Sequence, residues 1–185
     1  MSERLSPRPS ESKEGVTVDA NVIKAFNDDY ARNVDSTERV LIERIARTIG
    51  FVVDVGGKIK HQWFDLCRSV FLQEWYVANL YHGVIREVSP KNDARHRKKL
   101  VNDLGFPAKG FDLDYIFVAN AGTTRYILTE DMDFFDPSLK LADDKAKMRA
   151  KHERKGAVCR YLSKEMDICV GTASHAYEDL FSPSP

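Results

Sequence analysis

Apolar and polar positions along the chain separate short strands from longer helices. Four apolar runs, rich in β-branched and aromatic side chains, end at polar or turn-forming residues as buried strands do. These runs cover residues 16–18, 51–53, 125–129 and 168–170. Because the expected strands alternate with helices, the pattern favours an α/β fold in which helices cover both faces of a mainly parallel sheet.

Apolar residues at helical spacing mark the segments between these runs. Residues 36–49 form one such segment, with Ser36 as the expected N-cap and Gly50 as the stop. One long helix is expected over residues 59–82, and its aromatic side chains cover more than a single face. Further helices are expected over residues 92–104, 112–121 and 174–180, and the highly charged segment 136–163 is expected to be mostly helical.

The length of 185 residues fits one domain. We expect a flexible arm over residues 1–15, the domain over 16–181 and an unstructured tail over 182–185. No apolar run reaches the roughly 20 residues of a membrane span, and the first residues lack an apolar signal core. The three cysteines lie far apart, which argues against a disulfide framework. These features predict a cytoplasmic protein without membrane contact.

Charge is balanced overall and uneven locally. The 28 Lys and Arg residues equal the 28 Asp and Glu residues, so the chain has no global positive field for nucleic acid. One tight basic run includes Arg95, Arg97, Lys98 and Lys99. This run is either a solvated helix face or a track of phosphate contacts for RNA.

Aspartates stand just beyond two of the expected strands, Asp19 after the first and Asp131 after the third. In parallel sheets, ligands bind in the crevice beyond the carboxyl ends of the strands. Grouped carboxylates repel one another, and hard divalent ions such as Mg²⁺ or Mn²⁺ offset that repulsion. Taken singly, each aspartate is equally well read as a former of a turn at a strand end.

Four segments carry a resemblance to the PIN-domain family over residues 16–181. Residues 16–22 (VTVDANV) resemble its opening strand, and residues 114–121 (DYIFVANA) resemble a helix headed by an acid. The segment 126–134 (YILTEDMDF) matches the most specific signature, an apolar strand followed by Thr-x-Asp and Asp-Phe. Residues 167–172 (DICVGT) are similar to its last strand.

The resemblance implies a three-layer α/β/α nuclease fold that cleaves single-stranded or structured RNA with Mg²⁺ or Mn²⁺. By position, Asp19, Asp114 and Asp131 would be the catalytic, metal-binding carboxylates. Asn21 and Thr129 would be polar supports, with the Thr129 hydroxyl orienting Asp131, the last of these carboxylates, by a hydrogen bond. The remaining candidate, Asp133, is either a further metal ligand or a cap for the next turn.

One position departs from the family pattern. The family usually places a glutamate early on the helix after the second strand, where this chain has the neutral Gln62. Asp54, Asp65 and Glu74 are nearby acids that could replace it. Two functions follow as alternatives: a metal-dependent endoribonuclease, or a catalytically weak PIN-like scaffold that binds a protein partner in a toxin–antitoxin or defence assembly. A homodimer, and cleavage of DNA or flap structures, also stay open.

Overall fold

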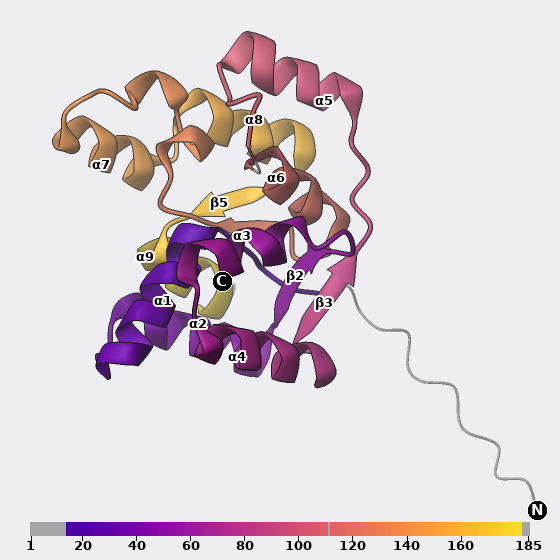
Figure 1. Ribbon diagram of the computed structural model, residues 1–185. Helices are drawn as coiled ribbons and strands as arrows, with labels where there is room; N and C mark the ends of the chain where they lie inside the picture. Colours follow the sequence, from indigo (N-terminus) through magenta and orange to yellow (C-terminus); the bar gives the residue numbers. More distant parts are fainter. Residues whose placement is uncertain (1–13, 111, 183–185) are drawn as a thin grey trace, which may run out of the picture.

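The computed structural model describes residues 14–110 and 112–182, and its centre is a small parallel sheet (Figure 1). The strands are β1 (Thr17–Val18), β2 (Phe51–Asp54), β3 (Ile85–Val88), β4 (Tyr126–Leu128) and β5 (Cys169–Gly171). Parallel pairing joins β1 to β4, β4 to β5 and β2 to β3. A parallel bridge between Val16 and Phe51 connects the two groups, giving the order β3-β2-β1-β4-β5.

Helices surround this sheet. They are α1 (Ala20–Arg32), α2 (Thr37–Thr48), α3 (Lys58–Cys67), α4 (Val70–Tyr81), α5 (Ala94–Lys98), α6 (Asp112–Ala121), α7 (Asp144–Glu153), α8 (Ala157–Met166) and α9 (Ala173–Phe181). In Figure 1, α1, α2, α4 and α9 lie on one side of the sheet, and α5 to α8 lie on the other. The α/β class is therefore confirmed, in an arrangement compatible with a three-layer sandwich.

The expected start and stop of α2 are confirmed. Ser36 accepts a hydrogen bond from the backbone N–H of Arg39, and Leu41 and Ile45 are buried on the sheet side. Gly50 follows with a φ of +88°, and a Cβ there would lie 2.4 Å from the carbonyl oxygen of Val84. Glycine is required because only it combines this backbone conformation with so close an approach.

The expected single helix over residues 59–82 is wrong. Arg68 adopts a left-handed conformation with a φ of 47°, which ends α3. Ser69 then caps α4 by accepting from the backbone N–H of Leu72 at 3.3 Å. The aromatic residues are divided between two helices, which explains why they cover more than one face of a single expected helix. Trp63 on α3 and Tyr76 on α4 are almost fully enclosed.

Two elements were not expected from the pattern. Helix α1 follows Asp19 directly, and β3 lies between α4 and α5 as a fifth strand. The expected helix over 92–104 comprises α5 and a π-helical turn, Lys99–Asp103. No helix in the described ranges is long and apolar enough to cross a membrane. Most of the expected arm and tail, residues 1–13 and 183–185, falls outside those ranges.

Candidate functional site

The strand order reverses between β1 and β4. From β1 the chain builds outward to β2 and β3, whereas β4 continues to β5 on the other side. Connections that leave two adjacent parallel strands in opposite directions open a crevice at the carboxyl ends. Asp19 follows β1 at this edge, and the segment that begins at Thr129 follows β4.

Asp19 is held in a buried position at the reversal point. Its side chain is 4% exposed, and its Oδ2 accepts the Thr129 hydroxyl at 2.8 Å. Its Oδ1 accepts the backbone N–H of Asn21 at 3.4 Å, which makes Asp19 the N-cap of α1. Burial raises the pKa of Asp19, although the Thr129 hydrogen bond opposes the rise. The Thr129 hydroxyl therefore orients the carboxylate of Asp19 and not, as the resemblance implied, that of Asp131. Asn21 contributes its backbone and leaves its own side chain exposed.

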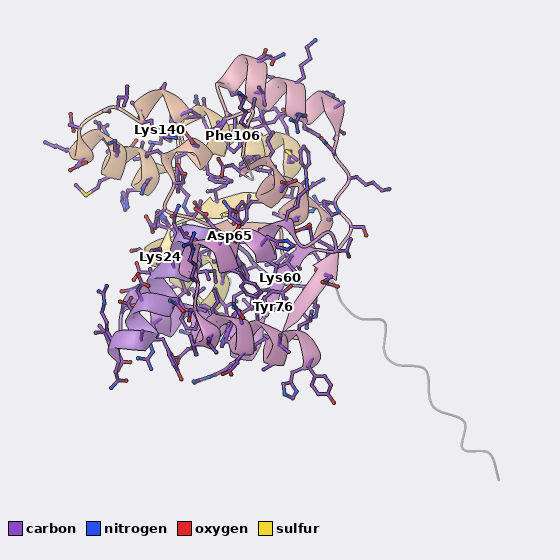
Figure 2. The ribbon with its side chains drawn as sticks, in the orientation of Figure 1. Lys24, Lys60, Asp65, Tyr76, Phe106 and Lys140 are labelled. Atoms are coloured by element: carbon purple, nitrogen blue, oxygen red, sulfur yellow. The ribbon has the colours of Figure 1, made fainter. Side chains whose placement is uncertain are left out.

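The loop after β4 is folded by its own side chains. The backbone N–H of Asp131 donates to the Thr129 hydroxyl at 3.0 Å, and Asp131 Oδ1 accepts from the backbone N–H of Asp133 at 2.9 Å. Asp131 thus caps the 3-10 turn Met132–Phe134. Capping a turn was one of the two roles expected for Asp133. The 2% exposed Asp133 instead pairs with the ammonium group of Lys140 at 2.7 Å. Lys140 is labelled in Figure 2.

A fourth acid, Asp112, lies near these three aspartates in the first turn of α6. Residues two positions apart lie on opposite sides of a helix, so Asp112 and Asp114 face different surroundings. Burial and the charges of Asp131, Asp19 and Asp133 raise the pKa of Asp112 to about 6. Asp112 therefore lies near the other three aspartates. We call these four residues, Asp19, Asp112, Asp131 and Asp133, the acidic cluster.

Asp114, the residue chosen from the sequence, points elsewhere. Its Oδ1 accepts the Lys58 ammonium at 2.9 Å, on the opposite side of α6. The sequence resemblance placed the acid at the helix start, and both aspartates satisfy that description. The two aspartates differ in helix face: Asp112 shares its face with Tyr115, three residues later, and Tyr115 also lies near Asp19.

Gln62 belongs to a neutral hydrogen-bond chain beside the cluster. The Tyr115 hydroxyl donates to Gln62 Oε1 and accepts from the backbone N–H of Ala20 at 3.2 Å. Burial holds the pKa of Tyr115 well above its usual value, so its hydroxyl keeps its proton. The next residue, Trp63, donates its indole N–H to the carbonyl of Val18 at 3.1 Å and thereby fixes α3 against β1.

The other acids considered near Gln62 lie apart from this chain. Asp54 is 3% exposed and accepts the backbone N–H groups of Lys58 and Ile59 at 3.0 and 2.9 Å. It therefore stabilises the start of α3. Asp65 and Glu74 are exposed on α3 and α4.

The predicted RNA-binding residues divide between two cavities. Arg95, Lys98 and Lys99 line one of about 470 Å³ with Tyr161 on α8, and Lys99 also pairs with Asp103 at 3.0 Å. Arg97 lines another cavity of about 280 Å³, which includes Lys58 and Asp114. Only the second cavity shares an element, α6, with the acidic cluster.

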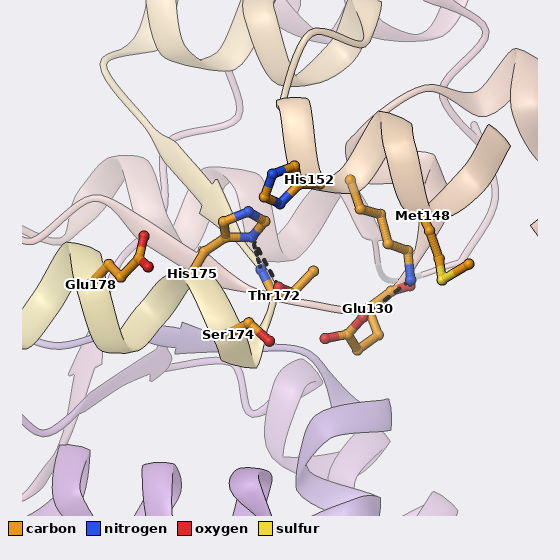
Figure 3. Close-up of a pocket in the computed structure, with 8 residues that line it drawn as sticks. Glu130, Met148, His152, Thr172, Ser174, His175 and Glu178 are labelled. Atoms are coloured by element: carbon orange, nitrogen blue, oxygen red, sulfur yellow. Dashed lines mark hydrogen bonds and ion pairs between the residues drawn. The ribbon is translucent and has the colours of Figure 1, made fainter. Parts of the chain in front are cut away.

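A further pocket of about 340 Å³ lies behind Glu130 (Figure 3). The carboxylate of Glu130 accepts from Lys151 on α7 at 3.1 Å and from the backbone N–H of Ala173 on α9 at 3.3 Å. His175 completes the cap of α9 through hydrogen bonds with Thr172. These contacts connect the loop that carries Asp131 to two helices. We therefore interpret the residues that line this pocket as structural support for the acidic cluster.

The acidic cluster offers carboxylate oxygens only, the kind of donor that Mg²⁺ and Mn²⁺ take. Carboxylate oxygens are the ligands such ions prefer, and Mg²⁺ is commonly held by one or two carboxylates while it keeps several waters. Within residues 14–110 and 112–182, no three His, Cys, Asp or Glu side chains are placed so that together they could hold a metal ion. Comparison with protein-family models, curated proteins and solved structures finds no match to this chain.

Proposed function

We propose that this chain is a metal-dependent endoribonuclease with a PIN-like three-layer fold, which hydrolyses RNA phosphodiesters at the carboxyl edge of its sheet. Asp19, Asp112 and Asp131 would hold Mg²⁺ or Mn²⁺, with Asp133 beside them. The observation that carries the proposal is the gathering of four aspartates at the strand reversal, where burial first, and then the charges of Asp131, Asp19 and Asp133, raise the pKa of Asp112 to about 6. The cost of that repulsion favours a site that attracts cations.

Each neighbouring residue has a defined task in this proposal. Thr129 donates to Asp19 and so keeps one carboxylate oxygen oriented, while the second, which accepts the backbone N–H of Asn21, has a further lone pair. Lys140 holds Asp133 and supplies one positive charge next to the path of the phosphate. A bound divalent ion would supply an activated water and offset the charge of the phosphodiester.

The test is cleavage of labelled single-stranded RNA in the presence of Mn²⁺. Asp131→Asn and Asp112→Asn are each expected to lower the rate by about 100-fold or more, because both remove charge from the cluster. Asp114→Asn is expected to lose far less, and Asp144→Asn, which changes an exposed residue of α7, serves as the control. Equal loss in Asp112→Asn and Asp114→Asn would contradict the assignment of Asp112. Single-stranded DNA and flap substrates in parallel reactions distinguish the substrate classes.

A PIN-like scaffold that binds a protein partner is the second candidate. It is favoured by the exposed side of α4, where Val70, Val77 and Tyr81 are 69%, 63% and 86% exposed. The neutral Gln62 is the other observation in its favour. Wild-type protein that cuts none of the RNA and DNA substrates, yet forms a stable complex that Val77→Lys disrupts, would replace the nuclease with the scaffold.

A further inference from the structure

The cavity that contains Arg97 lies at the same sheet edge as the acidic cluster. Lys58 enters it from the start of α3, and Asn92 enters it from the connection after β3. Asp114 and Phe117 form its wall on α6. Asp112 and Asp114 belong to the same first turn of α6 and project from opposite sides of it. This turn therefore lies between the cavity and the four aspartates.

The charges in this cavity suit a phosphate. Lys58 and Arg97 contribute two positive charges and Asp114 contributes one negative charge, so the cavity is positive by one. Arg97 is exposed and pairs with no acid in the described part of the chain, which leaves its guanidinium fork for a bidentate contact. This setting differs from that of Lys99, whose ammonium is already paired.

Asp114 acts as an internal substitute for that phosphate. It holds the Lys58 ammonium at 2.9 Å, and the two side chains are 23% and 58% exposed respectively. Ion pairs this exposed contribute little to stability, so an incoming phosphate can displace the carboxylate. The volume of about 280 Å³ is near the lower end for small-ligand pockets and holds a phosphate with its sugar.

We propose that the Lys58–Arg97 cavity binds one backbone phosphate of a single-stranded nucleic acid and guides the strand over α6 to the acidic cluster. The inference rests on the proposed function for its substrate class. It also assigns Asp114 a new task, in which the aspartate holds Lys58 in place until the strand arrives. Arg97, rather than the other members of the basic run, then contacts the strand next to the site.

The test measures binding without cleavage. Fluorescence anisotropy follows a labelled oligouridylate in EDTA, where a metal-dependent nuclease cannot cut. Arg97→Gln is expected to weaken binding by about 5- to 10-fold and to lower the slope of log K against log salt by about one. Asp114→Asn is expected to tighten binding by about 3-fold or more, since it removes a negative charge and releases Lys58. Arg95→Gln, on the same short helix but in the other cavity, is the matched comparison.

Several outcomes would overturn the inference. It fails if Arg95→Gln weakens binding as much as Arg97→Gln, or if Asp114→Asn weakens it. It also fails if uridine monophosphate alone competes with an affinity that depends on Arg97, because the ligand would then be a free nucleotide. Wild-type protein that binds in the expected way but does not cut with Mn²⁺ would reject the nuclease and keep the cavity. Cutting with no effect of Arg97→Gln on binding would do the reverse.

Discussion

At the scale of single residues, the acidic cluster is a set of carboxylates whose neighbours determine their protonation. Asp112 has its pKa raised to about 6, first by burial and then by three like charges. Asp19 is raised mainly by burial. A carboxyl group whose folded-state pKa exceeds its unfolded value costs no stability at low pH. It opposes folding increasingly as pH rises from the unfolded pKa to the folded one.

This sign leads to a stability prediction for Asp112→Asn. Without metal, the substitution is expected to raise the melting temperature at about pH 8, where Asp112 is charged, and to change it little at about pH 4, where the wild-type side chain is protonated. Thermal unfolding in EDTA at both pH values measures this. Asp114→Asn is the comparison and should not stabilise, because it loses the Lys58 contact. A gain at pH 4 as large as that at pH 8 would contradict the electrostatic cause.

At the scale of elements, the change from α3 to α4 depends on one backbone conformation. Arg68 takes a φ of 47° and a ψ of 42°, and its N–H closes α3 onto the carbonyl of Phe64. A non-glycine residue in this region costs roughly 1–2 kcal/mol relative to the right-handed form. The turn redirects the chain. Trp63 packs next to β1, and the ring of Tyr76 contacts the ring of Trp63 edge to face.

Arg68→Gly tests the importance of this turn. Glycine removes the left-handed strain but adds entropy to the unfolded chain, so the net gain in unfolding free energy is expected to be about 0.5–1 kcal/mol. Glu74→Gly, at an exposed position inside α4, is the matched control and should cost about 1 kcal/mol. Urea titration of both variants measures the difference. Equal destabilisation by both would show that the turn does not carry the strain assigned to it.

At the scale of the whole molecule, the charged segment 136–163 returns to the loop after β4. Lys140 pairs with Asp133, and Lys151 on α7 contacts the carbonyl and the carboxylate of Glu130. The nearby carboxylates raise the pKa of Lys140, so its ammonium remains charged. The segment that follows this loop in the chain therefore folds back and contacts the loop that carries Asp131, which links residues 136–163 to the candidate site.

Lys140→Gln is expected to expose the dependence of the cluster on that charge. In EDTA it should lower the unfolding free energy by about 1–3 kcal/mol, because Asp133 is buried and loses its ion-pair partner. Mn²⁺ should restore stability more in this variant than in wild type, since the ion offsets the unpaired charge and stabilises in proportion to its binding. Chemical unfolding with and without Mn²⁺ measures both effects. Lys145→Gln, at an exposed position of α7, is the control. An equal response of the two variants would reject the role of Lys140.

Local patterns predicted most of the element positions. Ser36 and Gly50 bound α2 because capping and left-handed conformations depend on a few adjacent residues. The missed strand β3 carries only two buried apolar residues, Ile85 and Val88, with Arg86 and Glu87 between them. So short a run resembles a loop in isolation, and only pairing with β2 makes it a strand.

Local periodicity and chain order were sufficient to predict the class of fold and the presence of acids after β1 and β4. Tertiary structure alone decided which acid of α6 joins them. Asp112 and Asp114 start the same helix turn, and the packing of Tyr115 against the residues near Asp19 sets the rotation of that helix. A rotation of this kind depends on contacts between residues nearly one hundred positions apart. No local pattern contains that information. For this reason the resemblance selected Asp114, whereas the residue that faces the cluster is Asp112, two positions earlier.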